Sequence, residues 1–221
     1  MNLRRSLCGS AVLAGACMLA PATGWTQTAP GPAPGSAPGS APGSAPKPKI
    51  VTDLALTYNA ERGQLAPDNC GCFWLQGAGV DAAVSLRNGI GIAAAFNGGR
   101  ASQVAPGVDI VKVQYLAGPR YTFTAHGKTA EPRAGLQLFG QALFGGVHAS
   151  SGEYPSPTGL NTEASSFAIE AGGGANVLLA HGFGVRIVEA DYVRNALPNN
   201  GSNTQNDLRI AFGVTWRFHA H

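Results

Sequence analysis

The stretch LRIAFGVTWRF, residues 208–218, alternates strictly between two kinds of side chain. Every even position is large and apolar, whereas the odd positions carry Arg209, Arg217 and small residues. A period of two is typical of a β-strand with two unlike faces. This strand therefore has one wholly apolar face and one face that carries charge.

The same alternation recurs along the chain after residue 50, and no segment has a helical period. Eight segments are predicted to be strands: residues 52–59, 74–86, 90–97, 110–124, 133–147, 165–179, 183–194 and 208–218. Most are longer than the usual five or six residues of a strand. A tilted strand that crosses a bilayer needs about nine to eleven residues. The segments therefore favour a membrane-spanning barrel over a soluble sheet.

The connections between these segments alternate between short and long. Tight turns are predicted at 87–89 and 180–182, with a moderate turn around 126–128. Long polar loops are predicted at 60–73, 98–109, 148–164 and 195–207. Short turns at one end and long loops at the other are typical of an outer-membrane barrel. The fold class predicted is an all-β, eight-stranded antiparallel up-and-down transmembrane barrel.

The polar faces of the strands carry both signs of charge. Isolated charges are costly to bury, but a balanced set can pair across a narrow lumen. The alternative, an apolar core with a charged exterior, would be a soluble lipocalin-like barrel. The predicted lumen charges are Asp53, Asp81, Lys112, Arg120, Glu170, Arg186, Glu189, Asp191, Arg209 and Arg217.

Aromatic residues gather toward the two ends of the predicted strands, and the middle is mostly aliphatic. Two aromatic girdles around an aliphatic band mark the two interfaces of a bilayer. The girdle at the long-loop end is predicted to contain Tyr58, Trp74, Phe96, Phe144, Phe167 and Tyr192. The girdle at the short-turn end is predicted to contain Tyr121, Phe123, Phe183, Trp216 and Phe218.

The seventh segment, FGVRIVEADYV, breaks the alternation. Phe183, Val185 and Ile187 set an outward phase that would aim Glu189 and Asp191 at lipid if it continued. A β-bulge inserts one extra residue and reverses the phase beyond it. We predict a bulge near residues 187–188 that turns both acids into the lumen.

The first fifty residues have a different character from the rest of the chain. Residues 1–22 read as a secretory signal peptide, with Arg4 and Arg5 before an apolar run that is too short to span a membrane. Lipid attachment at Cys17 is the alternative that this leaves open. Residues 23–50 are rich in Ala, Pro, Gly and Ser and are predicted to be a disordered linker. The barrel is predicted over 51–218, with a short tail at 219–221.

Several motifs bring the chain close to a known family. They are GPRYTF at 118–123, LFGQALFGG at 138–146, AGGGANV at 171–177, VEADYVR at 188–194 and NDLRIAFGVTWRF at 206–218. Across residues 51–218 the chain resembles the small OmpA-like outer-membrane β-barrel proteins of bacteria. The resemblance implies a monomer in the outer membrane, in contact with its lipids and lipopolysaccharide. It also implies that the barrel assembly machinery recognises the last strand through Phe218, although three residues follow it here.

Few residues offer chemistry of their own. Cys70 and Cys72 could form a small-ring disulfide in an oxidising compartment or stay as thiols, and they lack a third ligand for a metal. The glycine-rich runs do not open a helix, so they do not predict a phosphate loop. The net charge is +3, and part of it lies in the predicted signal peptide. The rest of the chain is close to neutral, so its charge does not predict binding to nucleic acid. No catalytic site, cofactor or metal is predicted.

Three functions are compatible with these patterns. The first is a non-enzymatic outer-membrane protein with a structural or surface-interaction role through long extracellular loops. The second is a narrow channel for small solutes or ions, because the lumen is charged. The third is the lipocalin-like binder in the periplasm. An eight-stranded barrel has an interior that side chains largely fill, which favours the first function over a wide pore.

Overall fold

The computed structural model describes residues 50–64, 72–86, 88–105, 108–126, 135–199 and 203–220. The predicted signal peptide, the linker up to residue 49 and Cys17 lie outside these residues. Within the described part of the chain, no helix is long and apolar enough to cross a membrane.

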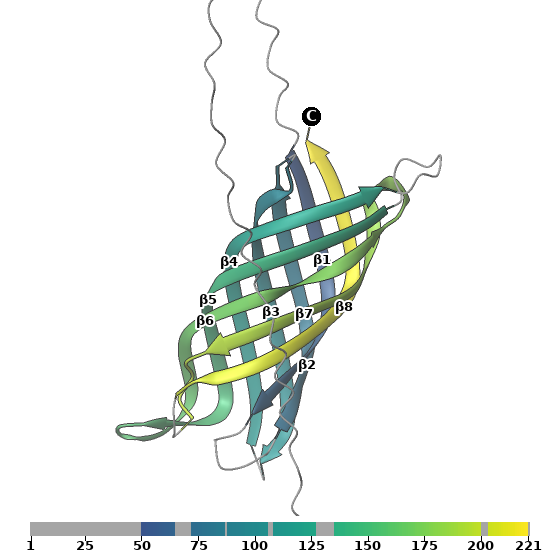
Figure 1. Ribbon diagram of the computed structural model, residues 1–221. Helices are drawn as coiled ribbons and strands as arrows, with labels where there is room; N and C mark the ends of the chain where they lie inside the picture. The colour runs from purple at the N-terminus through teal and green to yellow at the C-terminus, as the bar shows by residue number, and fades with distance from the viewer. Residues whose placement is uncertain are drawn as a thin grey trace, which may run out of the picture. The chain divides into compact units, whose positions relative to one another are not determined.

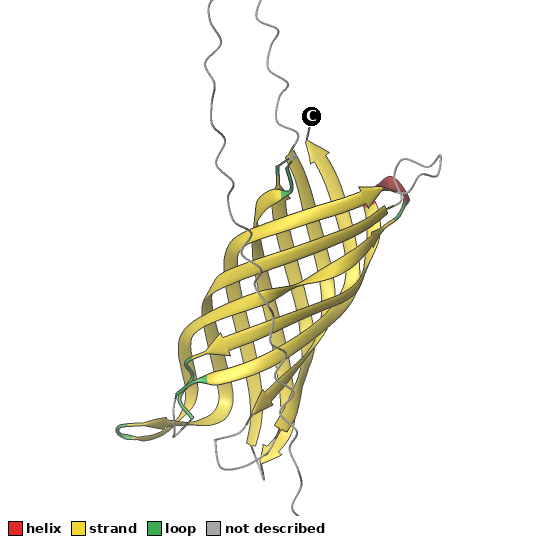
Figure 2. Cartoon of the chain, viewed as in Figure 1, coloured by secondary structure: helices red, strands yellow, loops and turns green. Residues whose placement is uncertain are grey.

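The described residues form a closed barrel of eight strands (Figure 1). Each strand pairs in antiparallel fashion with its neighbours in sequence, and β8 closes the barrel on β1. One 3₁₀ turn, η1, precedes β7, and no described residue is in an α-helix (Figure 2). The strands are β1 (Ile50–Gln64), β2 (Cys72–Ser85), β3 (Ile90–Ala105), β4 (Val108–His126), β5 (Gly135–Ser156), β6 (Gly159–Leu178), β7 (Phe183–Asn195) and β8 (Gln205–Ala220).

The structure confirms the fold class and all eight predicted strands, but it corrects the predicted long loops. Residues 98–109 and 148–164 are almost entirely strand, and the strands β1 and β2 extend into 60–73. The last strand likewise includes His219 and Ala220, which were assigned to the tail. Outside a bilayer both faces of a hairpin can meet water, so its strands need no apolar alternation. The polar composition of these segments therefore predicts a loop, although the hydrogen bonding between their strands continues.

The ladder has three irregularities outside the turns. The predicted bulge in β7 is confirmed. The pairing register with β8 shifts between Arg186 and Glu189, and the pairing register with β6 shifts at the same place. Ile187 and Val188 both point outward there, and Glu189 is buried inside. The other two shifts flank Gln103 in β3 and Ser151 in β5, each of which has a positive φ.

Burial follows the predicted phase in β8. Leu208, Ile210 and Phe212 are exposed on the outer surface, whereas Arg209 and Ala211 between them are buried. The outer surface of the other strands is likewise apolar, and most charged residues of the strands lie inside. This arrangement excludes the lipocalin-like alternative, because a soluble barrel would have the two faces reversed.

The interior is not polar throughout. An apolar cluster that includes Leu116, Leu143, Val147 and Tyr154 lies on the inner face of β4 and β5. The charges come largely from the opposite wall, on β1 and on β6 to β8. The barrel core therefore combines a polar wall with an apolar one, and the sequence pattern predicted only the first.

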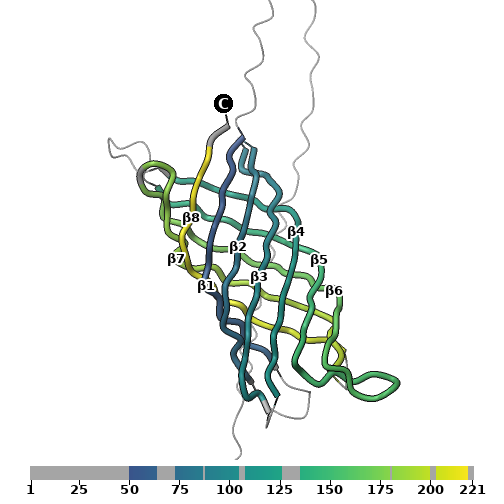
Figure 3. Tube along the Cα trace, turned by 180° about the vertical axis from the view of Figure 1, so that it is seen from behind, coloured from purple at the N-terminus to yellow at the C-terminus, as the bar shows by residue number. Residues whose placement is uncertain are grey.

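The two ends of the barrel differ (Figure 3). The start of β1 and the end of β8 lie together at one end, which we call the termini end. At the other end β5 and β6 continue well past their neighbours, because pairing with β4 stops at Ser150 and pairing with β7 stops at Ala168. We call this the hairpin end. It carries the larger protruding structure, which in outer-membrane barrels is the side that faces outward from the cell.

Candidate functional site

The lumen holds all ten of the charged residues that were predicted to lie there. Eight are fully buried, and Asp53 and Arg217 are half-buried at the termini end. Sequence reasoning missed two further lumen acids, Glu61 and Asp207. The described lumen therefore has seven acids against five bases, rather than the balanced set that was predicted.

At the termini end, one ion pair closes the barrel between its first and last strands. Arg217 Nε lies 2.7 Å from Asp53 Oδ1, and its Nη2 lies 3.0 Å from Oδ2. Gln137 on β5 donates to the same carboxylate, and Asn176 on β6 donates to Gln137. The charge of Arg217 is thus neutralised across the seam where β8 meets β1.

The next layer places two guanidinium groups on one aromatic ring. Arg120 and Arg186 lie 4.3 and 4.7 Å from the centre of the Phe139 ring, a geometry that favours cation–π attraction. Arg186 also pairs with Asp81 and with Glu189. Phe139 needs space on the neighbouring strand β6. A Cβ at position 174 would come within 2.9 Å of this ring, and the residue there is glycine.

Three carboxylates meet in the middle of the barrel. Oxygen atoms of Glu170, Glu189 and Asp191 lie within 4.8 Å of one another, and this is the described group that could hold a metal ion. Arg209 already supplies positive charge there: its Nη2 lies 2.7 Å from Glu170 and 3.0 Å from Asp191. Arg186 bonds Glu189. The acids are therefore held by protein cations, and they are buried because the bulge in β7 turned two of them inward.

The layer nearest the hairpin end centres on the only lysine among the described lumen residues. Lys112 Nζ pairs with Glu61 on β1 and lies 2.6 Å from Asp207 on β8. Asn195 donates to Asp207 as well. One lysine is thus shared between two carboxylates, which leaves this layer with an excess of negative charge.

The layers join into one polar network along the barrel. Gln141 accepts from Arg120 and donates to Glu170, which links the layer around Phe139 to the three carboxylates. Gln114 accepts from Arg209 and donates to Glu61, which links the next two. A network that satisfies most of its buried charges fixes the packing of the interior. It also occupies the space through which a solute would have to pass.

The outer surface has the opposite character. Every aromatic residue predicted for the two girdles points outward or lies partly exposed. The band between the girdles carries aliphatic residues such as Leu56, Val80 and Ile92. An apolar band bounded by aromatic residues, around a charged lumen, matches a barrel whose solvent on the outside is lipid. The chain folds as an outer-membrane β-barrel. Its localisation is the bacterial outer membrane.

No protein-family model and no curated protein matches the chain. The crystal structure of Ail, the attachment invasion locus protein of Yersinia pestis, in complex with the heparin analogue sucrose octasulfate, is 15% identical, with a TM-score of 0.45. That alignment covers 77% of this chain and 99% of Ail.

Two other solved structures show a similar degree of likeness. Neisserial surface protein A is 12% identical with a TM-score of 0.45, over 76% of this chain and 97% of its own. The N-terminal β-barrel domain of Pseudomonas aeruginosa OprF is 12% identical with a TM-score of 0.41, over 75% of this chain and 97% of its own. Strand pairing and burial in this chain itself define the closed barrel and its apolar outer surface.

Two outward aromatic residues were not predicted as part of a girdle. Tyr115 on β4 is exposed on the outer surface. Phe212 on β8 packs against Tyr58 on β1, with 5.2 Å between ring centres. In the other girdle, Phe183 packs edge-on against Trp216. Both ring pairs involve β8, and they fasten it to its two neighbours on the lipid side.

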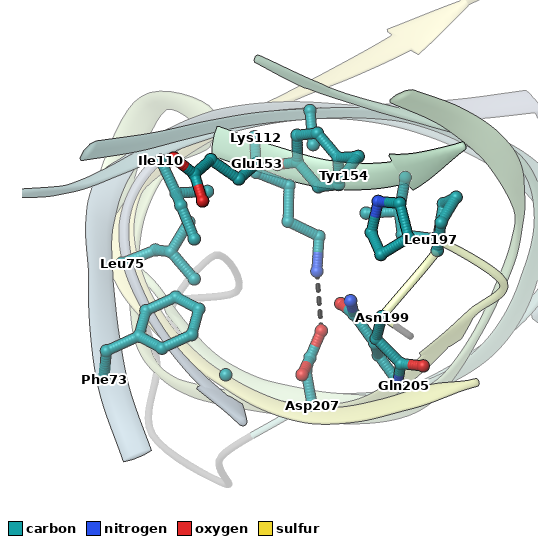
Figure 4. Close-up of a pocket in the computed structure, with 14 residues that line it drawn as sticks. Phe73, Leu75, Ile110, Lys112, Glu153, Tyr154, Leu197, Asn199, Gln205 and Asp207 are labelled. Carbon is teal, nitrogen blue, oxygen red and sulfur yellow. Dashed lines mark hydrogen bonds and ion pairs between the residues drawn. The ribbon is translucent and has the colours of Figure 1, made fainter. Parts of the chain in front are cut away.

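A cavity of about 230 Å³ opens at the hairpin end above the Lys112 layer (Figure 4). Phe73, Leu75 and Leu197 contribute apolar walls, and Lys112 and Asp207 point into it. Tyr154, from the part of β5 beyond the barrel wall, also lines it. Tyrosine is neutral near pH 7 at its ordinary pKa of about 10, and burial raises the pKa of the Tyr154 hydroxyl further, so this group can donate a hydrogen bond.

The cysteine prediction stays a prediction. Cys70 lies outside the described residues, and Cys72 is the first residue of β2, where only its backbone is described.

Proposed function

We propose that this outer-membrane barrel is a non-enzymatic protein that acts at the cell surface through its hairpin end. The observation that carries the proposal is the protruding hairpin, residues 151–167. Both of its strands have left their barrel neighbours, yet they remain paired with each other up to a two-residue turn at 157–158. Leu160 near the tip is 67% exposed.

A paired hairpin presents its side chains in a fixed arrangement. Beyond the barrel wall, the outer edges of its strands carry backbone groups without a neighbouring strand of the barrel. Such a structure suits contact with another surface, because little order has to be gained on binding. In this proposal the apolar belt contacts outer-membrane lipids and lipopolysaccharide, and β8 carries the signal for the barrel assembly machinery.

The lumen supports the same proposal over the channel alternative. The polar network runs from Asp53 at one end to Asp207 at the other, and side chains from all eight strands occupy the interior. Opening a path for solutes would require several buried ion pairs to break together. We therefore expect the native barrel to be closed.

The test uses cells that display the full chain in their outer membrane. In a shortened variant, residues 152–161 are replaced by Asn-Gly, a sequence that favours a two-residue hairpin turn between Ser151 and Thr162. We expect the parent to increase attachment to uncoated polystyrene or to wells coated with laminin or fibronectin, and the shortened variant to lose that gain. Heat-modifiable mobility on gels shows that the variant still forms a barrel.

A second arm addresses the channel. The refolded full chain is placed in a planar lipid bilayer, and the current is recorded. We expect no steady stepwise openings. Discrete openings, or attachment that is unchanged when the hairpin is shortened, would contradict the proposal.

A further inference from the structure

The cavity at the hairpin end has the form of a ligand site. Mouths of β-barrels are among the places where small molecules bind, and such sites combine apolar walls with a few polar groups. The volume of about 230 Å³ is below the roughly 300–1,000 Å³ of sites for drug-sized ligands. A matching ligand therefore has about one ring and a short chain.

The walls of this cavity are apolar on opposite sides. Phe73 and Leu75 come from β2, and Ile110 comes from β4. Tyr154 and Leu197 lie on the far side in Figure 4, so that the space between them and β2 forms a slot for an apolar group.

The charged residues at the bottom of the cavity determine whether a bound ligand is a cation or an anion. Lys112 Nζ is bonded to both Glu61 and Asp207, so its positive charge is already shared between two carboxylates. Glu153 adds a third acid at the rim of the cavity. An anion would meet this negative excess, whereas a cation would neutralise it.

One carboxylate oxygen of Asp207 has no hydrogen-bond donor among the described residues. Its Oδ2 accepts from Lys112 and from Asn195, but its buried Oδ1 accepts no hydrogen bond from any residue that the structure describes. Buried polar atoms without a partner are uncommon in proteins. The Oδ1 atom therefore lacks a donor, and it belongs to a residue that lines the cavity.

We infer that the cavity binds small amphipathic organic cations, with a protonated amine at Asp207 and an apolar body in the slot between Phe73 and Leu197. Glu153 and Tyr154 of the protruding hairpin line this site, but binding of a ligand inside the barrel mouth does not require the hairpin to contact another surface. It gives the outer-membrane barrel a second kind of partner, a small molecule that arrives from outside the cell.

The test compares three probes of one shape and different charge. The full chain is refolded in detergent micelles, and binding of 2-phenylethylamine, 2-phenylethanol and 3-phenylpropionate is measured by titration calorimetry, with empty micelles as the blank. We expect the amine to bind at least tenfold more tightly than the alcohol, and the carboxylate to show no saturable binding. Equal binding of all three, or preference for the carboxylate, would overturn the inference.

Variants assign the binding to the site. Asp207→Asn should weaken amine binding at least tenfold and leave the alcohol unaffected. Asp53→Asn is the matched control, because it makes the same change in an ion pair at the opposite end of the lumen. It should leave amine binding within twofold of the parent value.

A further variant keeps the test decisive if Asp207→Asn does not fold. Leu197 lies outside the strands, and Leu197→Ala should weaken the amine and the alcohol by similar factors because both lose the same apolar contact. Amine binding that survives both Asp207→Asn and Leu197→Ala would contradict the site, as would the absence of saturable amine binding to the parent.

Discussion

Replacing Arg209 by methionine is expected to lower the free energy of unfolding of the barrel by about 3–5 kcal/mol, the cost typical of removing one partner of a buried ion pair. Arg209 is the only cation that the structure places within bonding distance of Glu170 and Asp191, among the residues it describes. Methionine fills much of the same volume but leaves both carboxylates without their partner, close to a third acid, Glu189.

Urea titration of the full chain in phospholipid vesicles, followed by tryptophan fluorescence, measures this loss. Arg194→Met is the matched control, because Arg194 lies on β7 and faces outward, and it should change the free energy by no more than about 0.5 kcal/mol. Adding Glu170→Gln and Asp191→Asn to Arg209→Met should restore most of the loss, since the uncompensated charges are then gone. A loss below about 1 kcal/mol for Arg209→Met would contradict the role given to the network.

Deleting single residues in β7 is expected to give opposite results at neighbouring positions. Deletion of Ile187 should leave a folded barrel, because Ile187 and Val188 both face outward opposite one residue of β8. Without Ile187 the ladder becomes regular, and Glu189 and Asp191 keep their inward positions. The bulge supplies one residue more than the alternation needs.

Deletion of Ala190 should prevent folding. A one-residue slip moves side chains to the other face of a strand. If the bulge is kept, Asp191 turns toward lipid, and if the bulge is lost instead, Glu189 does. Either outcome breaks a buried ion pair, at about 3–5 kcal/mol, and adds the cost of an acid in lipid.

Heat-modifiable mobility after refolding distinguishes the two deletions. The expected result is a folded band for the Ile187 deletion and only the unfolded band for the Ala190 deletion. Equal behaviour of the two variants would mean that the bulge does not set the phase of β7.

The parts of the fold that cross the bilayer were predictable because lipid imposes a period of two. That constraint located all eight strands and revealed the bulge, since Glu189 and Asp191 would otherwise point into hydrocarbon. The charge balance of the lumen was harder to predict. Glu61 and Asp207 lie in segments whose polar composition reads as loop, so the two partners of Lys112 were missed.

Other features depend on contacts between strands, which a local pattern does not contain. Leu116 and Leu143 belong to a buried apolar cluster to which several strands contribute, among them the neighbouring strands β4 and β5. The stacking of Arg120 and Arg186 on Phe139 depends on three strands, and the cavity at the hairpin end depends on how far β5 extends past β4. The local sequence pattern contains no signal for these contacts between strands.

The direction in which the side chains of β8 point decides whether the apolar face of the barrel meets lipid. Spin labels can be attached at single cysteines at positions 210, 212 and 214, and at 211 and 215, in a full chain whose four native cysteines are replaced by serine. Collision of each label with oxygen, which concentrates in lipid, and with a water-soluble nickel complex is measured by electron paramagnetic resonance in phospholipid vesicles. We predict high oxygen contact at 210, 212 and 214 and low oxygen contact at 211 and 215. The reverse alternation, or high contact with the nickel complex at the even positions, would contradict the account.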